Sequence, residues 1–471
     1  MIIVILAIEM FRRKNIKLSL LMLASYVFYY FDSGYLFVLL LFSSVLDFYC
    51  GKKIYESDEV KRRKLFLTFS IIGNLGILGF FKYTNFAIES INGLFELFGG
   101  VPQFNTLNIF LPVGISFFTF QTMSYTIDIY RRKLKPVKSF LKFGMFVAFF
   151  PQLVAGPIVR AAVFLPQLKN KVVITSKNLK MGLTFISWGL IKKIVFADNI
   201  APYVNAIFAD PVGLSSFVVI LGAVGFGIQV YCDFSAYSDI ATGCARIFGF
   251  KFPKNFNKPY FSRSVSEFWT RWHISLSTWF RDYVFTPILG KRISLPRMYF
   301  SIFVTFLLSG LWHGASWNFV IWGGLHGFFL VFSLITNKLR AGFVNFIGLS
   351  KFPKLHSRIR LIITQYLIFL SLLVFRAENF EHIVYTMKKF IFLDFLTNIP
   401  SILSYMLENK FFILLIIMFF YLHTASYKVK NVIERINSLE LKYWFFYVVF
   451  VILLLFLFTP NLNTAFIYFQ F

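Results

Sequence analysis

The sequence predicts an all-α protein that crosses a membrane many times. Of its 471 residues, 58% are hydrophobic and only 15% are charged, whereas soluble proteins carry about a quarter charged residues. Apolar runs also recur along the whole chain, and most approach the ~20 residues that a helix needs to cross a bilayer. These runs are 18–31, 35–49, 65–81, 182–197, 215–232, 298–312, 317–335, 361–375, 411–422 and 443–459.

The first of these elements is preceded by a short apolar stretch that ends in a basic cluster, MIIVILAIEMFRRK. A signal peptide has its basic residues first, so we expect a short first membrane segment there instead. With the runs above, this gives about ten to twelve membrane segments. The positive-inside rule places the basic loops in the cytoplasm. These loops are 11–17, 52–64, 131–135, 246–297 and 336–360, and the external segments are 31–34, 99–106 and 376–410.

One stretch, 140–157, does not fit a simple crossing. It contains FFPQLVAGP, in which proline and glycine interrupt the apolar run, and both of its flanks are basic. Irregular backbone at membrane depth has to be buried in protein or line a wet cavity. We therefore expect a re-entrant segment.

The net charge of +27, from 48 basic and 21 acidic residues, would suggest a nucleic-acid partner in a soluble protein. In a membrane protein it has a simpler explanation. The basic residues lie in loops beside apolar runs, which is typical of topology signals and of contact with anionic membrane lipid. No stretch combines stacking aromatic residues with a basic groove outside the membrane, so we expect no nucleic-acid partner.

Three cysteines, Cys50, Cys232 and Cys244, are an odd number without a CxxC pair. This pattern excludes a disulfide framework and favours small core residues. Neither an HExxH motif nor paired histidine and carboxylate spacing occurs, so we expect no metal site. A GxSxG elbow and a P-loop are also absent from the sequence, which disfavours a self-contained serine hydrolase.

The sequence SGLWHGASW, residues 309–317, places His313 between two apolar runs. The preceding run of about 15 residues is about 22 Å long as a helix, less than the ~30 Å hydrocarbon thickness, so the turn is expected below the outer surface. Glycines there allow close approach, and Trp312 and Trp317 can exclude water. A histidine in such a site suits a general base. The alternative is a histidine that only bonds a neighbouring helix.

His326 lies 13 residues further on. On one continuous helix that spacing rotates it about 220° away from His313. We therefore expect His326 to face elsewhere and to have a structural role, hydrogen bonding within WGGLHG. His356, in a basic loop, and His382 and His423, near segment ends, are expected at solvent or at the membrane interface.

His273 lies in SEFWTRWHISLSTWFRDYVF, residues 266–285, where charged residues alternate with large aromatic ones. Ser264 or Ser266 can cap the start of a helix here. The pattern predicts an amphipathic helix at the cytoplasmic interface. The simple interpretation is a membrane anchor; the alternative is a mouth for a cytoplasmic ligand, with Arg271 and Arg281 near its anionic groups.

Asp233 and Asp239 lie near the cytoplasmic end of one apolar run, in QVYCDFSAYSDIATGCAR. Carboxylates at membrane depth are paired or functional. We expect a structural role, in which they pair with Arg246 or with loop arginines.

Six motifs in order carry a resemblance to a known family. They are LPVGISFFTFQTMSYTIDIYR (111–131), FFPQLVAGPIVR (149–160), YCDFSAYSDIATGCARIFGF (231–250), FWTRWHISLSTWFRDYVF (268–285), GLWHGASWNFVIWGGLHG (310–327) and the terminal FIYFQF (466–471). Together they resemble the membrane-bound O-acyltransferase family, in particular the bacterial branch typified by the membrane subunit of alginate O-acetyltransferase. The resemblance covers nearly the whole chain.

The resemblance implies a fold and a site. The fold is a ring of roughly eleven transmembrane helices around a central tunnel, with re-entrant and amphipathic segments, in one domain over 1–471. Within it we expect N-terminal spans at 1–106, the family core at 107–340 and C-terminal spans at 341–471. The family's essential histidine matches His313, and a second, tunnel-facing histidine matches His273.

The resemblance also implies a reaction in the bacterial cytoplasmic membrane. An acyl group, usually acetyl, leaves a cytoplasmic thioester of coenzyme A or an acyl carrier protein and reaches hydroxyls of a polysaccharide or another envelope polymer. A hydrolase-like extracytoplasmic partner often completes the transfer. No bound cofactor is expected. We predict His313 as the base and His273 as the residue that orients the thioester or hydrogen-bonds its carbonyl, with Trp312, Trp317 and Asn318 shaping the acyl pocket.

Two other classes of function stay open from the residues alone. A transporter or flippase for an envelope precursor would also have polar residues in the membrane, but it would more often show an internal repeat. A non-catalytic scaffold would tolerate the loss of both His273 and His313.

Overall fold

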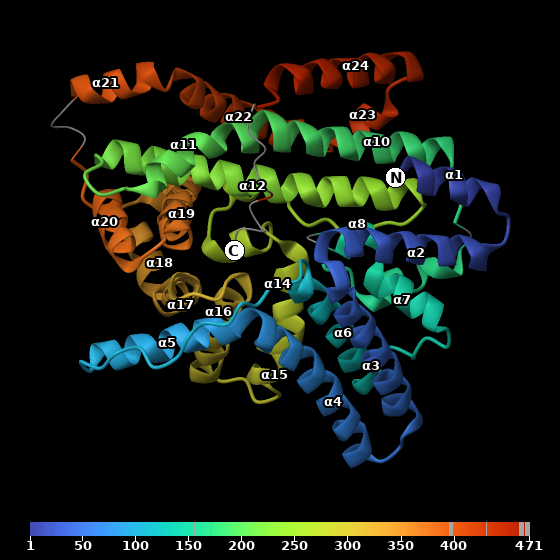
Figure 1. Cartoon of the computed structure of the whole chain (residues 1–471). Helices are drawn as coiled ribbons and strands as arrows, with labels where there is room; N and C mark the ends of the chain where they lie inside the picture. The colour runs from blue at the N-terminus through green and yellow to red at the C-terminus, as the bar shows by residue number, and fades with distance from the viewer. Residues whose placement is uncertain (154–155, 171, 395–398, 430, 461–465, 467–471) are drawn as a thin grey trace. The chain divides into compact units, whose positions relative to one another are not determined.

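The computed structural model describes residues 1–153, 156–170, 172–394, 399–429, 431–460 and 466, and helices joined by loops make up this part of the chain (Figure 1). No strand occurs in this part of the chain. Eight helical stretches within it are long and apolar enough to cross a membrane, so the prediction of an all-α polytopic protein is confirmed. The number eleven, the tunnel and the three segments of the domain stay predictions. Apart from Phe466, the terminal FIYFQF lies outside the described residues.

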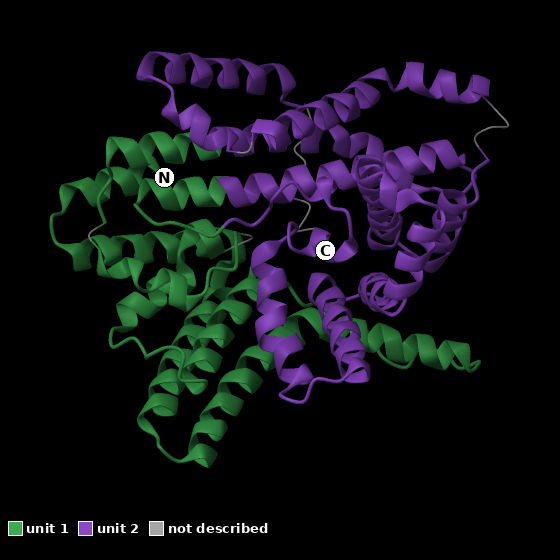
Figure 2. Cartoon of the chain, turned by 180° about the vertical axis from the view of Figure 1, so that it is seen from behind, with its two compact units in different colours: residues 1–186, 240–253 green, residues 187–239, 254–471 purple. Residues whose placement is uncertain are grey.

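The chain forms two compact units, which Figure 2 colours separately. Unit 1 comprises 1–186 and 240–253, and unit 2 comprises 187–239 and 254–471. The helices of unit 1 are α1 (Ile2–Met10), α2 (Lys14–Ser33), α3 (Phe37–Glu56), α4 (Val60–Leu78), α5 (Thr84–Leu97), α6 (Ile115–Tyr130), α7 (Phe140–Ala148), α8 (Phe150–Leu153) and α9 (Ala161–Phe164), followed by most of α10 (Ser176–Leu190).

A buried polar network joins α3, α4 and α6, which pack side by side in unit 1 (Figure 1). The Asp47 carboxylate accepts hydrogen bonds from Ser70 Oγ at 2.6 Å and from Asn74 Nδ2 at 2.8 Å. Ser43 donates to Asn74 Oδ1 at 2.5 Å, and Ser70 shares a hydrogen bond with Thr126. All of these side chains are buried. They bond to one another, which is how polar groups hold membrane helices together.

The stretch predicted to be re-entrant is broken in the structure. Helices α7 and α8 are 9 and 4 residues long and are separated at Phe149. The freed backbone is satisfied by buried amides, because Gln121 and Gln152 both donate to the carbonyl of Phe146, at 2.7 and 2.6 Å. This confirms the irregular backbone. Residues 154–155 of the motif lie outside the described residues.

Unit 2 contains the rest of the chain. After α10 come the π-helical segment η4 (Ile191–Ala197), α11 (Asp198–Ala209) and α12 (Ser216–Ile247), whose last turns belong to unit 1. The later helices are α13 (Val265–Trp269), α14 (Ile274–Phe280), η6 (Arg281–Phe285), α15 (Thr286–Leu289), α16 (Leu295–His313), α17 (Trp317–Ile335), α18 (Asn337–Phe346), α19 (Pro353–Arg376), α20 (Phe380–Ile391), α21 (Ile399–Glu408), α22 (Lys410–Val429), α23 (Val432–Ser438) and α24 (Leu441–Phe458).

The expected hairpin of two apolar helices is present as α16 and α17. The two helices touch through glycine: a Cβ on Gly310 would lie 2.2 Å from the carbonyl oxygen of Phe319, and one on Gly323 would lie 2.3 Å from that of Phe306. Small residues allow this close approach of two backbones in a membrane. The contact fixes the place of the turn that follows α16, and with it His313.

The single amphipathic helix predicted for 266–285 is wrong. Ser264 does cap a helix start, since its side chain accepts a hydrogen bond from the backbone N–H of Glu267, but α13 ends after one turn at Trp269. His273 then adopts the left-handed conformation, with φ of 41° and ψ of 53°, before α14 begins. A helix cannot continue through such a residue. The periodic charge pattern hid this break.

The three cysteines are free thiols, as predicted. Cys50 and Cys232 are buried, and Cys244 is half-buried.

Candidate active site

His313 is the last residue of α16 and is 6% exposed. Its imidazole is surrounded by aromatic rings. The ring centroids of Trp312, Trp322 and Phe375 lie 5.0, 5.1 and 5.6 Å away, each ring standing nearly perpendicular to the imidazole. Three elements therefore enclose it: the end of α16, the second turn of α17 and the end of α19. The walls keep the imidazole away from bulk water on these sides.

An apolar pocket opens onto this imidazole. Besides His313 it is lined by residues of α12, of the 260–272 segment, of α17 and of α19. The lining residues are Val230, Phe234, Tyr260, Phe268, Trp272, Trp322, His326, Ile368, Ser371, Leu372 and Phe375. Predominantly apolar pockets with a few convergent polar groups are typical of small-molecule sites. The polar groups on the lining side chains are two imidazoles, two hydroxyls and two indole N–H groups.

His273 does not line the pocket, but it is linked to His313 through the Trp312 ring. The Trp312 ring centroid lies 5.9 Å from that of His273, which is fully buried and also packs on Phe234 at 4.6 Å. Burial lowers the pKa of His273 from its ordinary 6.5 to about 3, because desolvation opposes the charged form. A neutral imidazole can donate one hydrogen bond and accept another.

A loop holds His273 in its left-handed conformation. The carbonyl of Asn255 accepts a hydrogen bond from the N–H of Ile274 at 2.8 Å, and its side-chain oxygen accepts from the N–H and the hydroxyl of Ser275. On the other side, the N–H of Asn257 donates to the carbonyl of Arg271. Strained residues persist where the surrounding structure fixes them, and they cluster at functional sites.

His326 lines the pocket together with His313, so the prediction that it faces elsewhere is wrong. The predicted rotation assumed one continuous helix. In the structure the chain turns between α16 and α17, and the two histidines come from antiparallel neighbours. His326 does form hydrogen bonds, but its partners are Trp269 and Ser371, not residues of WGGLHG as predicted. His423 also differs from prediction: it is buried and stacks on Phe261 and Phe419.

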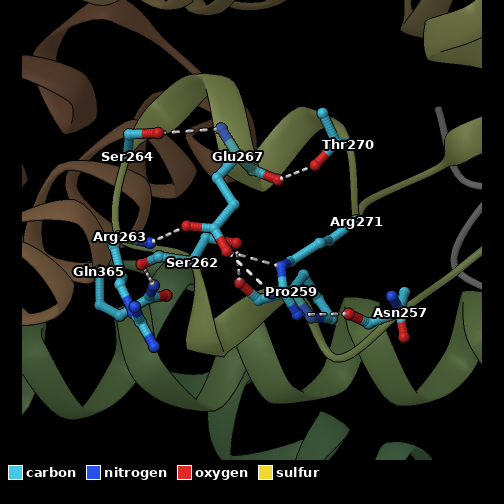
Figure 3. Close-up of polar contacts among 9 residues, drawn as sticks. All are labelled: Asn257, Pro259, Ser262, Arg263, Ser264, Glu267, Thr270, Arg271 and Gln365. Atoms are coloured by element: carbon cyan, nitrogen blue, oxygen red, sulfur yellow. Dashed lines mark hydrogen bonds and ion pairs between the residues drawn. The ribbon is translucent and has the colours of Figure 1, made fainter.

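Arg271, a predicted ligand for anionic groups, is engaged within the chain (Figure 3). Its Nε and Nη2 donate to Glu267 Oε1 at 3.0 and 2.8 Å, and its Nη1 donates to the carbonyl of Asn257. Glu267 Oε2 in turn accepts the N–H of Arg263. Arg271 thus ties α13 to the loop before it. Arg281, in contrast, is 61% exposed and pairs only with its neighbour Asp282 in the contacts described.

Asp233 and Asp239 form ion pairs, as predicted, but with other partners. Lys193 binds Asp233 and Asp198, both at 2.8 Å, and Lys192 binds Asp239 at 2.7 Å. The prediction of arginine partners is therefore wrong. Both lysines lie in η4, where the wider π turn places consecutive residues against α12. A lysine about forty residues upstream could not be chosen as a partner from the sequence pattern.

The two remaining predicted pocket residues lie at the start of α17. Trp317 is 59% exposed and does not line the pocket. Asn318 donates to the carbonyls of Phe375 and Ala377 and so joins α17 to the end of α19. Among the described residues, no group of three His, Cys, Asp or Glu side chains could hold a metal ion.

Comparison with known proteins identifies the family of this chain. The sequence model of the family "MBOAT, membrane-bound O-acyltransferase family" matches residues 131–375, more than half of the chain. The chain is also 38% identical over 365 residues to a protein of Azotobacter vinelandii named "Probable alginate O-acetylase AlgI", a match that covers 77% of this chain and 70% of that protein.

The chain belongs to the membrane-bound O-acyltransferase family.

Two other relatives of this membrane-bound O-acyltransferase are named for other acceptors. A peptidoglycan O-acetyltransferase of Helicobacter pylori is 35% identical over 398 residues, which cover 78% of this chain and 72% of the relative. A teichoic acid D-alanyltransferase of Bacillus subtilis is 32% identical over 235 residues, 46% of this chain and 58% of the relative. The chain is therefore a multi-pass membrane O-acyltransferase.

Sequence reasoning missed two walls of the site. Trp322 packs on His313 in the place predicted for Trp317, and Phe375 of α19 packs on the same imidazole. A signal for Trp322 was present, because Trp322 and His326 are four residues apart and so share one face of a helix. Phe375 offered no such signal, since it follows the histidine by 62 residues.

Proposed function

We propose that this membrane-bound O-acyltransferase transfers acetyl groups from a cytoplasmic thioester, across the membrane, to hydroxyls of an extracytoplasmic polysaccharide or envelope polymer. Its place would be the bacterial cytoplasmic membrane. The names of the relatives support this range, since they refer to alginate, peptidoglycan and teichoic acid. The observation that carries the proposal is a buried imidazole, His313, at an apolar pocket with aromatic walls.

The reaction needs little besides a base in a dry site. His313 takes the proton of an incoming hydroxyl, whose oxygen attacks the thioester carbonyl carbon. The carbon–sulfur bond then breaks, and the departing thiolate takes up a proton from the imidazolium. The products are thus an ester and a free thiol, and the imidazole ends the reaction as neutral as it began. Excluding water from the pocket spares the thioester from hydrolysis.

His273 suits a second role. Because burial keeps its imidazole neutral, it can hydrogen-bond the thioester carbonyl without carrying charge, and so steady the oxyanion that forms during attack. Trp312 packs against both imidazoles and sets their separation. The donor can be acetyl-CoA or an acyl carrier protein, and a hydrolase-like extracytoplasmic protein would be the partner that completes transfer to the polymer.

The test compares His313→Ala with His356→Ala in producing cells. The second variant changes a histidine in the loop end of α19, far from the pocket lining. We expect His313→Ala to lower ester-linked acetate in envelope polymers by about a thousandfold at normal protein level, since loss of a base costs 10²–10⁴-fold. Retained acetate would reject the base. Movement of an envelope precursor without any new ester would favour the transporter instead.

A further inference from the structure

His326 joins three elements around the pocket. It lies on α17, and its two ring nitrogens contact α13 and α19. The Trp269 indole N–H donates to Nδ1 at 3.2 Å, and Nε2 lies 3.0 Å from the Ser371 hydroxyl oxygen. All three side chains are buried. Both nitrogens of this buried imidazole therefore have polar partners, as burial requires.

These contacts fix the position of each hydrogen. An indole nitrogen can only donate, so His326 Nδ1 must accept and carry no proton. The proton of the neutral ring is then on Nε2 and is donated to Ser371 Oγ. The Ser371 hydroxyl donates its own hydrogen to the carbonyl of Ile368 at 2.7 Å. The chain of hydrogen bonds therefore runs in one direction and holds the ring in one tautomer and one orientation.

The ring held in this way packs on Trp322, which packs on His313. The centroids of His326 and Trp322 are 4.7 Å apart, and those of Trp322 and His313 are 5.1 Å apart, both in edge-to-face geometry. Trp269 also touches Trp322, at 5.8 Å. Edge-to-face aromatic contacts depend on ring orientation. A change at His326 can therefore reach His313 through one indole.

We propose that His326 is a positioning residue for the acyl transfer: bonded by Trp269 and Ser371, it fixes the Trp322 indole against His313 and so aims the base. The inference rests on the proposed function of His313. In this role His326 acts through Trp322 and not by bonding the substrate. This role also explains why His326 lies in the same pocket as His313 although both of its ring nitrogens are already hydrogen-bonded within the protein.

Three substitutions at His326 separate the two bonds. His326→Asn keeps a group that can accept from Trp269, His326→Gln keeps one that can donate to Ser371, and His326→Leu keeps neither at similar volume. Membrane vesicles of producing cells, which contain partner and acceptor, would receive radiolabelled acetyl-CoA on the cytoplasmic face. We expect kcat per folded molecule to fall about tenfold or more for Leu and less for Asn and Gln, with the KM for acetyl-CoA unchanged.

Two gentler variants guard against misfolding. Trp269→Phe removes the donor to Nδ1, and Ser371→Ala removes the acceptor of Nε2; each should lower kcat without changing KM. The double variant Trp322→Phe with His326→Leu should be no slower than the slower of its two single variants, because both changes act through the same indole. Independent, multiplying effects would overturn the proposal.

A matched control is His423→Leu, the same change at a buried histidine of unit 2 that does not line the pocket. It should lower the temperature of unfolding and leave kcat per folded molecule unchanged. If the His326 variants behave in the same way, His326 is merely structural and the inference fails. If wild-type vesicles form no ester from acetyl-CoA and His313→Ala cells keep their ester-linked acetate, the proposed function itself fails. The two failures are therefore distinguishable.

Discussion

Buried polar residues in the two units differ in what surrounds them. In unit 1, Asp47, Ser70 and Asn74 bond to one another and to hydroxyls of neighbouring helices. In unit 2, His313 and His273 are enclosed by aromatic rings beside an apolar pocket. Polar groups at membrane depth mark either helix association or chemistry. The side chains around a buried polar group, rather than its depth in the membrane, therefore distinguish helix association from chemistry.

The comparison would break if the unit 1 network affected the reaction. Asp47→Leu leaves the Ser70 hydroxyl and the Asn74 amide without their shared acceptor, which should cost about 2 kcal/mol of unfolding free energy. We expect a lower unfolding temperature in detergent and unchanged acyl transfer per folded molecule. Asp58→Leu, the same change at an exposed residue of unit 1, should do neither. A tenfold loss of transfer in the Asp47 variant would make the network part of the site.

The pH dependence of stability sharpens the comparison for unit 2. His273 has a folded-state pKa of about 3 against an ordinary 6.5, so the unfolded chain binds the extra proton first as pH falls. Stability is therefore full above pH 6.5 and is lost below it, by at most about 1.4 kcal/mol per pH unit from this residue. We expect His273→Gln to flatten the decline in unfolding temperature between pH 6.5 and pH 4. An unchanged slope would show that His273 is hydrated or paired when folded.

The smallest effect is expected at the exposed arginine. Arg281→Ala removes an ion pair at the surface with Asp282, which should change the unfolding free energy by less than about 0.5 kcal/mol. If the 281 position meets an anionic donor, the KM for acetyl-CoA should rise severalfold while kcat stays the same. Arg292→Ala, in the exposed loop after α15, is the matched control. Equal KM values in both variants would remove Arg281 from the donor path.

Much of the site could be predicted because its signals are local. The SGLWHGASW turn and the capping serine follow from a few adjacent residues, and each was found where expected. His326 was misplaced because a three-residue turn resets the phase of a helix, so spacing alone cannot be carried across it. The partners of Asp233 and the Phe375 wall come from distant parts of the chain, and no periodicity links them.

The left-handed backbone at His273 affects which residues homologous proteins can have at this position. Its φ of 41° costs a side-chain-bearing residue about 1–2 kcal/mol that glycine avoids and asparagine largely escapes. A descendant that no longer needed the imidazole would gain stability by drifting to one of those two residues. Glycine at this position, which offers no side-chain donor, would therefore mark a homologue that does without this hydrogen bond, whereas an asparagine amide could still supply it.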